Sequence, residues 1–109
     1  MNWIYLNNEV QLETLKETSN QKPQLIFKHS TRCAISSTAK SRLERLPQPE
    51  GIDFYYLDLI QHRALSHEIA EVFNVYHESP QVLLIKNGEC IYDESHSGIQ
   101  MNEIIEQAQ

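Results

Sequence analysis

The feature that most constrains this chain is a regular alternation of short apolar runs with segments of helical periodicity. Apolar runs bounded by turn residues predict buried strands at residues 24–29, 52–57 and 81–85. Between them, residues 34–46 and 61–75 repeat apolar side chains every three to four positions, which predicts amphipathic helices. Strands that alternate with helices are typical of α/β domains in which helices cover both faces of a sheet.

The two ends of the chain extend this pattern. Residues 3–6 form a short apolar run, and Asn7-Asn8 precede a helix expected at about 9–18. Lys86-Asn87-Gly88-Glu89 carries an Asn-Gly hairpin signal, so residues 90–93 should return as a strand. A last helix is expected over residues 101–108. The predicted order is β-α-β-α-β-α-β-β-α, the thioredoxin topology: a mixed sheet flanked by helices on both faces, with strands joined by helices pairing in parallel.

Each predicted helix should bury one apolar face against the sheet. The expected inward-facing residues are Val10, Leu12, Leu15, Ile35, Ala39, Leu43, Leu46, Leu65, Ile69, Val72, Phe73, Ile104, Ile105 and Ala108.

Composition limits the classes of function. The 109 residues are 40% hydrophobic, which predicts one folded domain over residues 1–109. A net charge of −6 argues against general binding to nucleic acid or to an anionic membrane. The N-terminus has no basic region of a signal peptide, and no stretch approaches the ~18 apolar residues of a spanning helix. We therefore expect a cytoplasmic protein with no nucleic-acid or membrane partner.

The charge is unevenly distributed. Residues 28–45 hold five cationic side chains and one acidic one, a local charge of +4, which leaves −10 for the remainder of the chain. A solvated helix face would explain this pattern. The alternative is that Lys28 and Arg32 favour the thiolate form of Cys33, which lies inside the segment.

Cys33 lies between the strand predicted at 24–29 and the helix predicted at 34–46. A helix N-terminus carries a partial positive charge and unpaired N–H groups, and both stabilise a thiolate. Ser36, three residues on, could donate a hydrogen bond to the sulfur but cannot form a disulfide. A small buried cysteine at a strand–helix junction is the competing interpretation. The second thiol, Cys90, is 57 positions away and is expected to be a sheet residue.

Three segments together resemble the monothiol bacilliredoxin family of the thioredoxin superfamily, and the similarity spans nearly the whole chain. They are Phe27-Lys28-His29-Ser30-Thr31-Arg32-Cys33-Ala34-Ile35-Ser36, His77-Glu78-Ser79-Pro80-Gln81 and Ser95-His96-Ser97-Gly98-Ile99. The family's box is T-C-P-I-S, so Ala34 stands here in place of its proline. The resemblance implies a cis peptide at Ser79-Pro80 facing Cys33, with the backbone before the proline pairing with a thiol substrate.

The resemblance also implies an activity. Cys33 would attack a mixed disulfide between a cytosolic protein and a low-molecular-weight thiol, keep the small thiol, and release the repaired protein. A second small thiol or a partner flavoprotein reductase would regenerate Cys33. The local positive charge fits a carboxylate-bearing co-substrate such as bacillithiol, although charge alone would not separate bacillithiol from glutathione. No metal is expected, because no histidine is paired with another His, Cys or acid at ligand spacing around Cys33 or Cys90. No bound cofactor is expected either, and the small thiol acts as a co-substrate.

Other residues near the motifs have competing interpretations. His29 is expected to pack near the site rather than act as a base, and Phe27 replaces the buried acid of thioredoxins. His96 and Ser97 could hold the carboxylate of the small thiol at a helix N-terminus, or form a plain turn and cap. His77 could line the substrate groove or lie in solvent. A glutathione-linked glutaredoxin-like protein and a non-catalytic peptide-binding module are the alternative functions.

Overall fold

The computed structural model describes residues 1–109, and its elements follow the predicted order. They are β1 (Trp3–Tyr5), α1 (Glu9–Thr18), β2 (Gln24–His29), α2 (Ala34–Glu44), β3 (Asp53–Asp58), α3 (Arg63–Val72), β4 (Gln81–Lys86), β5 (Glu89–Ser95), the 3₁₀ turn η1 (His96–Gly98) and α4 (Met101–Ala108). The bounds of α1, β2 and α4 are those predicted. Helix α2 ends two residues earlier than expected, and α3 is shorter at both ends.

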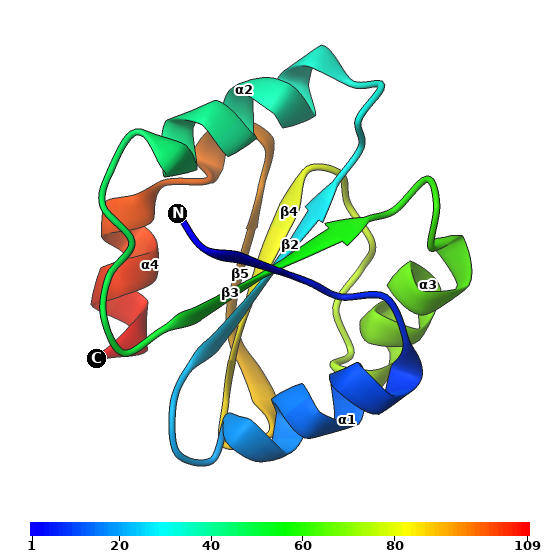
Figure 1. The fold of residues 1–109 in the computed structure, drawn as a ribbon, viewed down its shortest axis with the longest axis vertical. Helices are drawn as coiled ribbons and strands as arrows, with labels where there is room; N and C mark the ends of the chain where they lie inside the picture. Colours follow the sequence, from blue (N-terminus) through cyan, green and yellow to red (C-terminus); the bar gives the residue numbers. More distant parts are fainter.

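The five strands form one mixed sheet in the order β1-β3-β2-β4-β5. Strands β1, β3 and β2 run parallel, while β4 is antiparallel to β2 and β5 is antiparallel to β4. Figure 1 shows α2 and α4 on one face of the sheet and α1 and α3 on the other. The predicted α/β thioredoxin-like fold is therefore confirmed.

The direction of β4 differs from the prediction that every strand joined by a helix pairs in parallel. Strand β4 follows α3, yet it pairs antiparallel with β2, with Gln81 opposite Lys28. The reason is the length of chain after α3: residues 73–80 contain no helix or strand. In extended form such a segment spans roughly 25 Å, which is more than the length of the ten-residue helix α3. The segment therefore returns the chain to the edge of the sheet at which α3 begins. This return places the start of β4 beside the end of β2.

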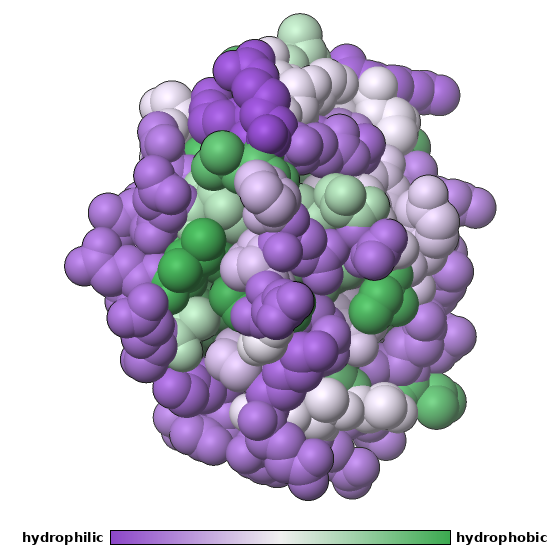
Figure 2. All heavy atoms as spheres, turned by 60° about the vertical axis from the view of Figure 1, so that its left-hand side comes forward, coloured by the Kyte–Doolittle hydropathy of each residue, from purple (hydrophilic) through white to green (hydrophobic).

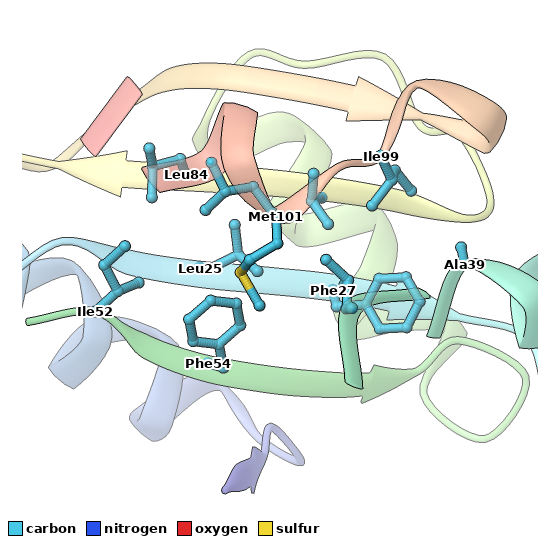
Figure 3. Close-up of a cluster of buried hydrophobic side chains, with 11 residues drawn as sticks. Leu25, Phe27, Ala39, Ile52, Phe54, Leu84, Ile99 and Met101 are labelled. Carbon is cyan, nitrogen blue, oxygen red and sulfur yellow. The ribbon is translucent and has the colours of Figure 1, made fainter. Parts of the chain in front are cut away.

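The two faces of the sheet have separate hydrophobic cores because side chains of a strand alternate between them. One cluster packs under α2 and α4: Leu25, Phe27, Ala39, Leu43, Ile52, Phe54, Val82, Leu84, Ile99, Met101 and Ile104. Figure 3 shows Leu25, Phe54 and Leu84 of three neighbouring strands meeting Met101 of α4. The second cluster packs under α1 and α3 and comprises Leu6, Leu12, Leu15, Ile26, Leu57, Leu65, Ile69, Phe73, Leu83 and Ile85.

Some residues predicted to face inward are exposed. Val10 is 74% exposed because it lies about 200° around the helix from Leu12, which is buried. Ile35 and Leu46 lie near the two ends of α2, outside the stretch from Ala39 to Leu43 that packs on the sheet. Val72, at the end of α3, is also exposed, and the following Phe73 is buried instead. Ile105 and Ala108 are half-buried against the α2–α4 cluster.

The outer surface is mainly polar. Figure 2 turns the side of the molecule that carries α4 toward the reader, and hydrophilic residues cover most of it, with separated hydrophobic patches between them. No helix has both the length and the apolar character needed to cross a bilayer.

Candidate active site

Cys33 is the N-cap residue of α2, with extended backbone angles of −110° and 120°. Its backbone N–H donates to the Ser30 carbonyl at 3.2 Å, and its own carbonyl accepts from the Ser37 N–H at 3.0 Å. The thiol is free and half-buried, and no side chain caps the helix. Cys33 therefore lies at the positive end of the α2 dipole. The first backbone N–H groups of the helix have no side-chain acceptor there. Cys33 thus lies at the start of the helix, as the sequence predicts, and its thiolate form stays a prediction.

The Ser79–Pro80 peptide is cis, as the resemblance implied, and Pro80 is buried. Pro80 immediately precedes Gln81, which pairs with Lys28 near the end of β2. Cys33 follows the same end of β2, so the two motifs meet at one edge of the sheet. The backbone N–H and carbonyl of Ser79 make no hydrogen bond within the chain, and the Ser79 hydroxyl is buried without a partner.

Ser36 differs from its predicted role of holding the sulfur. The side chain is fully buried, and its Oγ lies 2.6 Å from Nδ1 of His29 and accepts the Ser30 N–H at 3.0 Å. No hydrogen bond joins Ser36 to Cys33, because both contacts of the hydroxyl point toward the end of β2. Sequence spacing places Cys33 and Ser36 on the same side of the helix but does not identify the group that competes for the hydroxyl.

His29 packs near the site, as expected. Its ring is buried, with centroids 5.5 Å from Phe27 and 5.4 Å from Tyr56. Burial lowers the pKa of the imidazole and Lys40 lowers it further, against opposing effects of Asp58, Glu44 and a hydrogen bond with the backbone of Ser36. His29 is therefore neutral at neutral pH.

Lys28 does not lie beside Cys33, contrary to the prediction. Successive residues of a strand point to opposite faces, so Lys28 projects under α3 while His29 projects toward α2. Its side chain is fully buried, and Nζ donates to the Ser66 carbonyl at 3.1 Å and lies 3.2 Å from Nδ1 of His77. Burial lowers the pKa of Lys28 to about 8.

The positive charge around the thiol is consequently smaller than the sequence suggests. Lys40 forms an ion pair with Glu44 at 3.0 Å, and Arg42 donates to the Ile99 carbonyl at 2.9 Å. Arg45 lies at the far end of α2. Arg32, exposed next to Cys33, is the side chain of this group that remains free beside the thiol.

His96 and Ser97 form the short 3₁₀ turn η1 rather than the start of an α-helix, which begins at Met101. The His96 N–H donates to the Pro80 carbonyl at 3.1 Å, which fixes this turn against the proline. Its imidazole Nε2 lies 4.0 Å from a carboxylate oxygen of Glu78, and both side chains are about half exposed. The turn therefore borders Pro80, and a role in binding the small thiol stays a prediction.

Two residues anchor the segment before Pro80: Gln81, to which the sequence assigned no role, and His77, which was expected either to line the substrate groove or to lie in solvent. Gln81 donates from Nε2 to the Tyr76 carbonyl at 2.9 Å and accepts the Glu78 N–H at 3.3 Å. His77 lies 3.2 Å from the Ser66 hydroxyl as well as from Lys28, and burial lowers its pKa. The sequence feature that could have identified Gln81 is an amide side chain at the start of a strand that is otherwise apolar.

Cys90 lies at the other end of the sheet. It pairs with Ile85, and Ile85 pairs with Gln24, the first residue of β2, whereas Cys33 follows the last. A six-residue strand spans roughly 17 Å, too far for two thiols to meet. Cys90 lies in β5, as predicted, and burial raises the pKa of its thiol to about 11, so the thiol is protonated at neutral pH.

Comparison with known proteins agrees with this geometry. A family model described as monothiol bacilliredoxin BrxC matches residues 4–104. A solved structure described as a proposed oxidoreductase with a thioredoxin fold is 33% identical, with a TM-score of 0.85 over 97% of this chain and 93% of that one. The thioredoxin of Malassezia sympodialis is 16% identical (TM-score 0.79, 99% and 92% covered), and that of Fasciola hepatica is 19% identical (0.75, 96% and 98%). The latter two matches concern the fold.

Proposed function

Because the chain belongs to the monothiol bacilliredoxin family, we propose that it removes bacillithiol, or a similar low-molecular-weight thiol, from S-thiolated proteins. The family and the thioredoxin-like oxidoreductase fold support thiol–disulfide exchange as the class of reaction. The observation that carries the finer proposal is a single half-buried thiol at the N-cap of α2, with the second cysteine at the opposite end of the sheet.

The first step is an exchange at the small thiol of the mixed disulfide. The Cys33 thiolate attacks the sulfur of the small thiol, a new Sγ–S bond forms, and the bond to the protein cysteine breaks. The electron pair of the broken bond leaves with the protein thiolate, which takes a proton from solvent. Cys33 then carries the small thiol as its own mixed disulfide.

The second step needs a reductant from outside the chain. The serine at position 36 has no thiol, and Cys90 is too distant and too weakly ionised to resolve the Cys33 mixed disulfide. A second small thiolate attacks the small-thiol sulfur, yields the symmetrical disulfide and returns Cys33 as a thiolate. A flavoprotein reductase would reduce that disulfide with two electrons. The partners of the cycle are thus an S-thiolated protein, a small thiol and a reductase.

Three features support substrate binding at this edge of the sheet. The free backbone groups of Ser79 suit an incoming extended peptide, which would pair with them as an added strand. The exposed guanidinium of Arg32 suits the carboxylates of bacillithiol. His96, whose N–H donates to the Pro80 carbonyl, and the neighbouring Ser97 form a turn beside Pro80.

The test is to mix the protein with a target protein that carries bacillithiol on its cysteine and to locate adducts by mass spectrometry. We expect the target to lose the bacillithiol mass and Cys33 to gain it at neutral pH. The Cys33→Ser variant should show no transfer, and Cys90→Ser should match wild type. No adduct on Cys33 would refute the enzymatic proposal and favour the peptide-binding module. Faster transfer from a glutathionylated target would instead identify a glutathione-linked enzyme.

A further inference from the structure

A buried pair, His29 and Ser36, lies directly behind the turn that carries Cys33. His29 is the last residue of β2, and Ser36 lies in the first turn of α2. The His29 side chain is 4% exposed and Ser36 is fully buried. Their contact at 2.6 Å, with the Ser30 N–H on the same hydroxyl, joins the strand, the turn and the helix at one atom, Ser36 Oγ.

The direction of the His29–Ser36 hydrogen bond follows from counting protons. The Ser30 amide can only donate, so it uses one lone pair of the Ser36 oxygen. The hydroxyl proton then needs an acceptor, and the single remaining polar neighbour within hydrogen-bond distance is Nδ1 of His29. If Nδ1 carried the proton instead, the hydroxyl proton would be buried without an acceptor, which is costly. Ser36 therefore donates to Nδ1, and neutral His29 carries its proton on Nε2.

His29 is a rigid anchor for this bond. Its ring packs between Phe27 and Tyr56, and its backbone carbonyl accepts the Leu59 N–H at 3.0 Å. The charged groups around the ring are Lys40 and Glu44 of α2 and Asp58 of β3, and together with burial they leave the ring neutral at neutral pH. The helix, by contrast, begins with Cys33 and no side-chain cap, and Ser36 is the residue of its first turn that hydrogen-bonds to β2.

We propose that His29 is a positioning residue for thiol exchange: by accepting the Ser36 hydroxyl, it ties the first turn of α2 to β2 and fixes the direction in which Cys33 presents its sulfur. This inference rests on the thiol exchange proposed above. Exchange requires the three sulfurs to be nearly in line, so it is sensitive to the direction of approach. Alkylation by a small neutral reagent depends on the thiolate itself and far less on that direction.

The test compares these two reactions at Cys33 in the full-length protein. Exchange is followed with a peptide whose cysteine is disulfide-bonded to a coloured aromatic thiol; Cys33 attacks the peptide sulfur and the aromatic thiolate is released. Alkylation is followed with iodoacetamide by mass spectrometry. The His29→Phe variant keeps a ring of similar size but removes the acceptor, His29→Asn keeps an acceptor near Nδ1, and Ser36→Ala removes the donor.

We expect His29→Phe and Ser36→Ala to slow exchange about tenfold, while alkylation stays within about twofold of wild type. The double variant should be no slower than either single one, and His29→Asn should recover most of the rate. In wild type, long-range ¹H–¹⁵N spectra should place the neutral His29 proton on Nε2.

The proposal is overturned if a folded His29→Phe or Ser36→Ala protein exchanges at the wild-type rate, if alkylation falls as much as exchange, or if the proton is on Nδ1. If His29→Phe does not fold, Ser36→Ala and the tautomer decide. The peptide carries no bacillithiol, so failure to remove bacillithiol from proteins would refute the proposed function without affecting this comparison.

Discussion

Lys28 offers the sharpest test of how the sheet is built, because the fold buries its ammonium group completely beneath α3. The Ser66 carbonyl and His77 are its hydrogen-bond partners, and no carboxylate pairs with it. Burial lowers its pKa from 10.5 to about 8. The charged form is therefore less stable in the folded protein than in the unfolded chain. Replacing Lys28 with Met, which has a similar shape and no charge, removes this penalty.

The sign and size of the effect follow from the two pKa values. Below pH 8 both states are protonated, and the penalty is largest there, about 3 kcal/mol for a lowering of this size. Between pH 8 and 10.5 the folded state loses its proton first, so the unfolded state binds more protons and stability rises with pH. From pH 7 to pH 9.5 wild type should gain about 2 kcal/mol relative to Lys28→Met.

The assay is urea unfolding of both proteins at pH 7 and pH 9.5. The free energy of unfolding of Lys28→Met minus that of wild type should fall by about 2 kcal/mol between the two pH values. Other titrating groups cancel in this difference. Lys16→Met, at an exposed position of α1, is the matched control and should show a difference independent of pH. A pH-independent difference for Lys28→Met would refute the assignment of a charged, buried lysine.

Three further predictions concern the thiols and their surroundings. Ser36→Cys should form a disulfide with Cys33 that releases the small thiol, so mass spectrometry should detect less of the Cys33 adduct than in wild type. Arg32→Glu should slow the reaction of Cys33 with an anionic small-thiol disulfide about three- to tenfold at low salt and less at high salt, as stopped-flow measurements would show, whereas Arg45→Glu should have little effect. Since burial raises the pKa of the Cys90 thiol to about 11, its alkylation at pH 8 should be over tenfold slower than that of Cys33 in the same peptide map, and should accelerate on unfolding in urea.

The order of the elements was predictable from the sequence because each segment carries its own periodicity and turn residues. The apolar run of residues 24–29 and the Asn87-Gly88 turn needed no tertiary information. The direction of β4, by contrast, does require tertiary information. It depends on how far the segment after α3 extends across the sheet, and periodicity does not encode this distance. Exposure at helix ends, as at Ile35, likewise depends on where the underlying sheet stops.

The position of Cys33 at a helix start was also predictable from the strand and helix bounds, whereas its place beside Pro80 followed from the family resemblance, because bounds alone do not set the direction of β4. The charge around the Cys33 thiol could not be predicted in this way. A local charge of +4 read along the chain counts Lys28, which the alternation of β2 sends to the opposite face, and Lys40 and Arg42, which have partners of their own. The charge summed over a stretch of sequence is a poor measure of the charge around a side chain where a strand is followed by a helix. Neighbouring residues of the strand point to opposite faces of the sheet there.

These contacts change what can stabilise the sulfur in a one-thiol site. The Ser36 hydroxyl is committed to His29, and most nearby cations have other partners, while the backbone N–H groups at the start of α2 are capped by no side chain. The first of these belongs to Ala34, at the position where the family's box has a proline. Proline has no N–H, so the start of α2 in this chain carries one backbone donor that the family's box lacks.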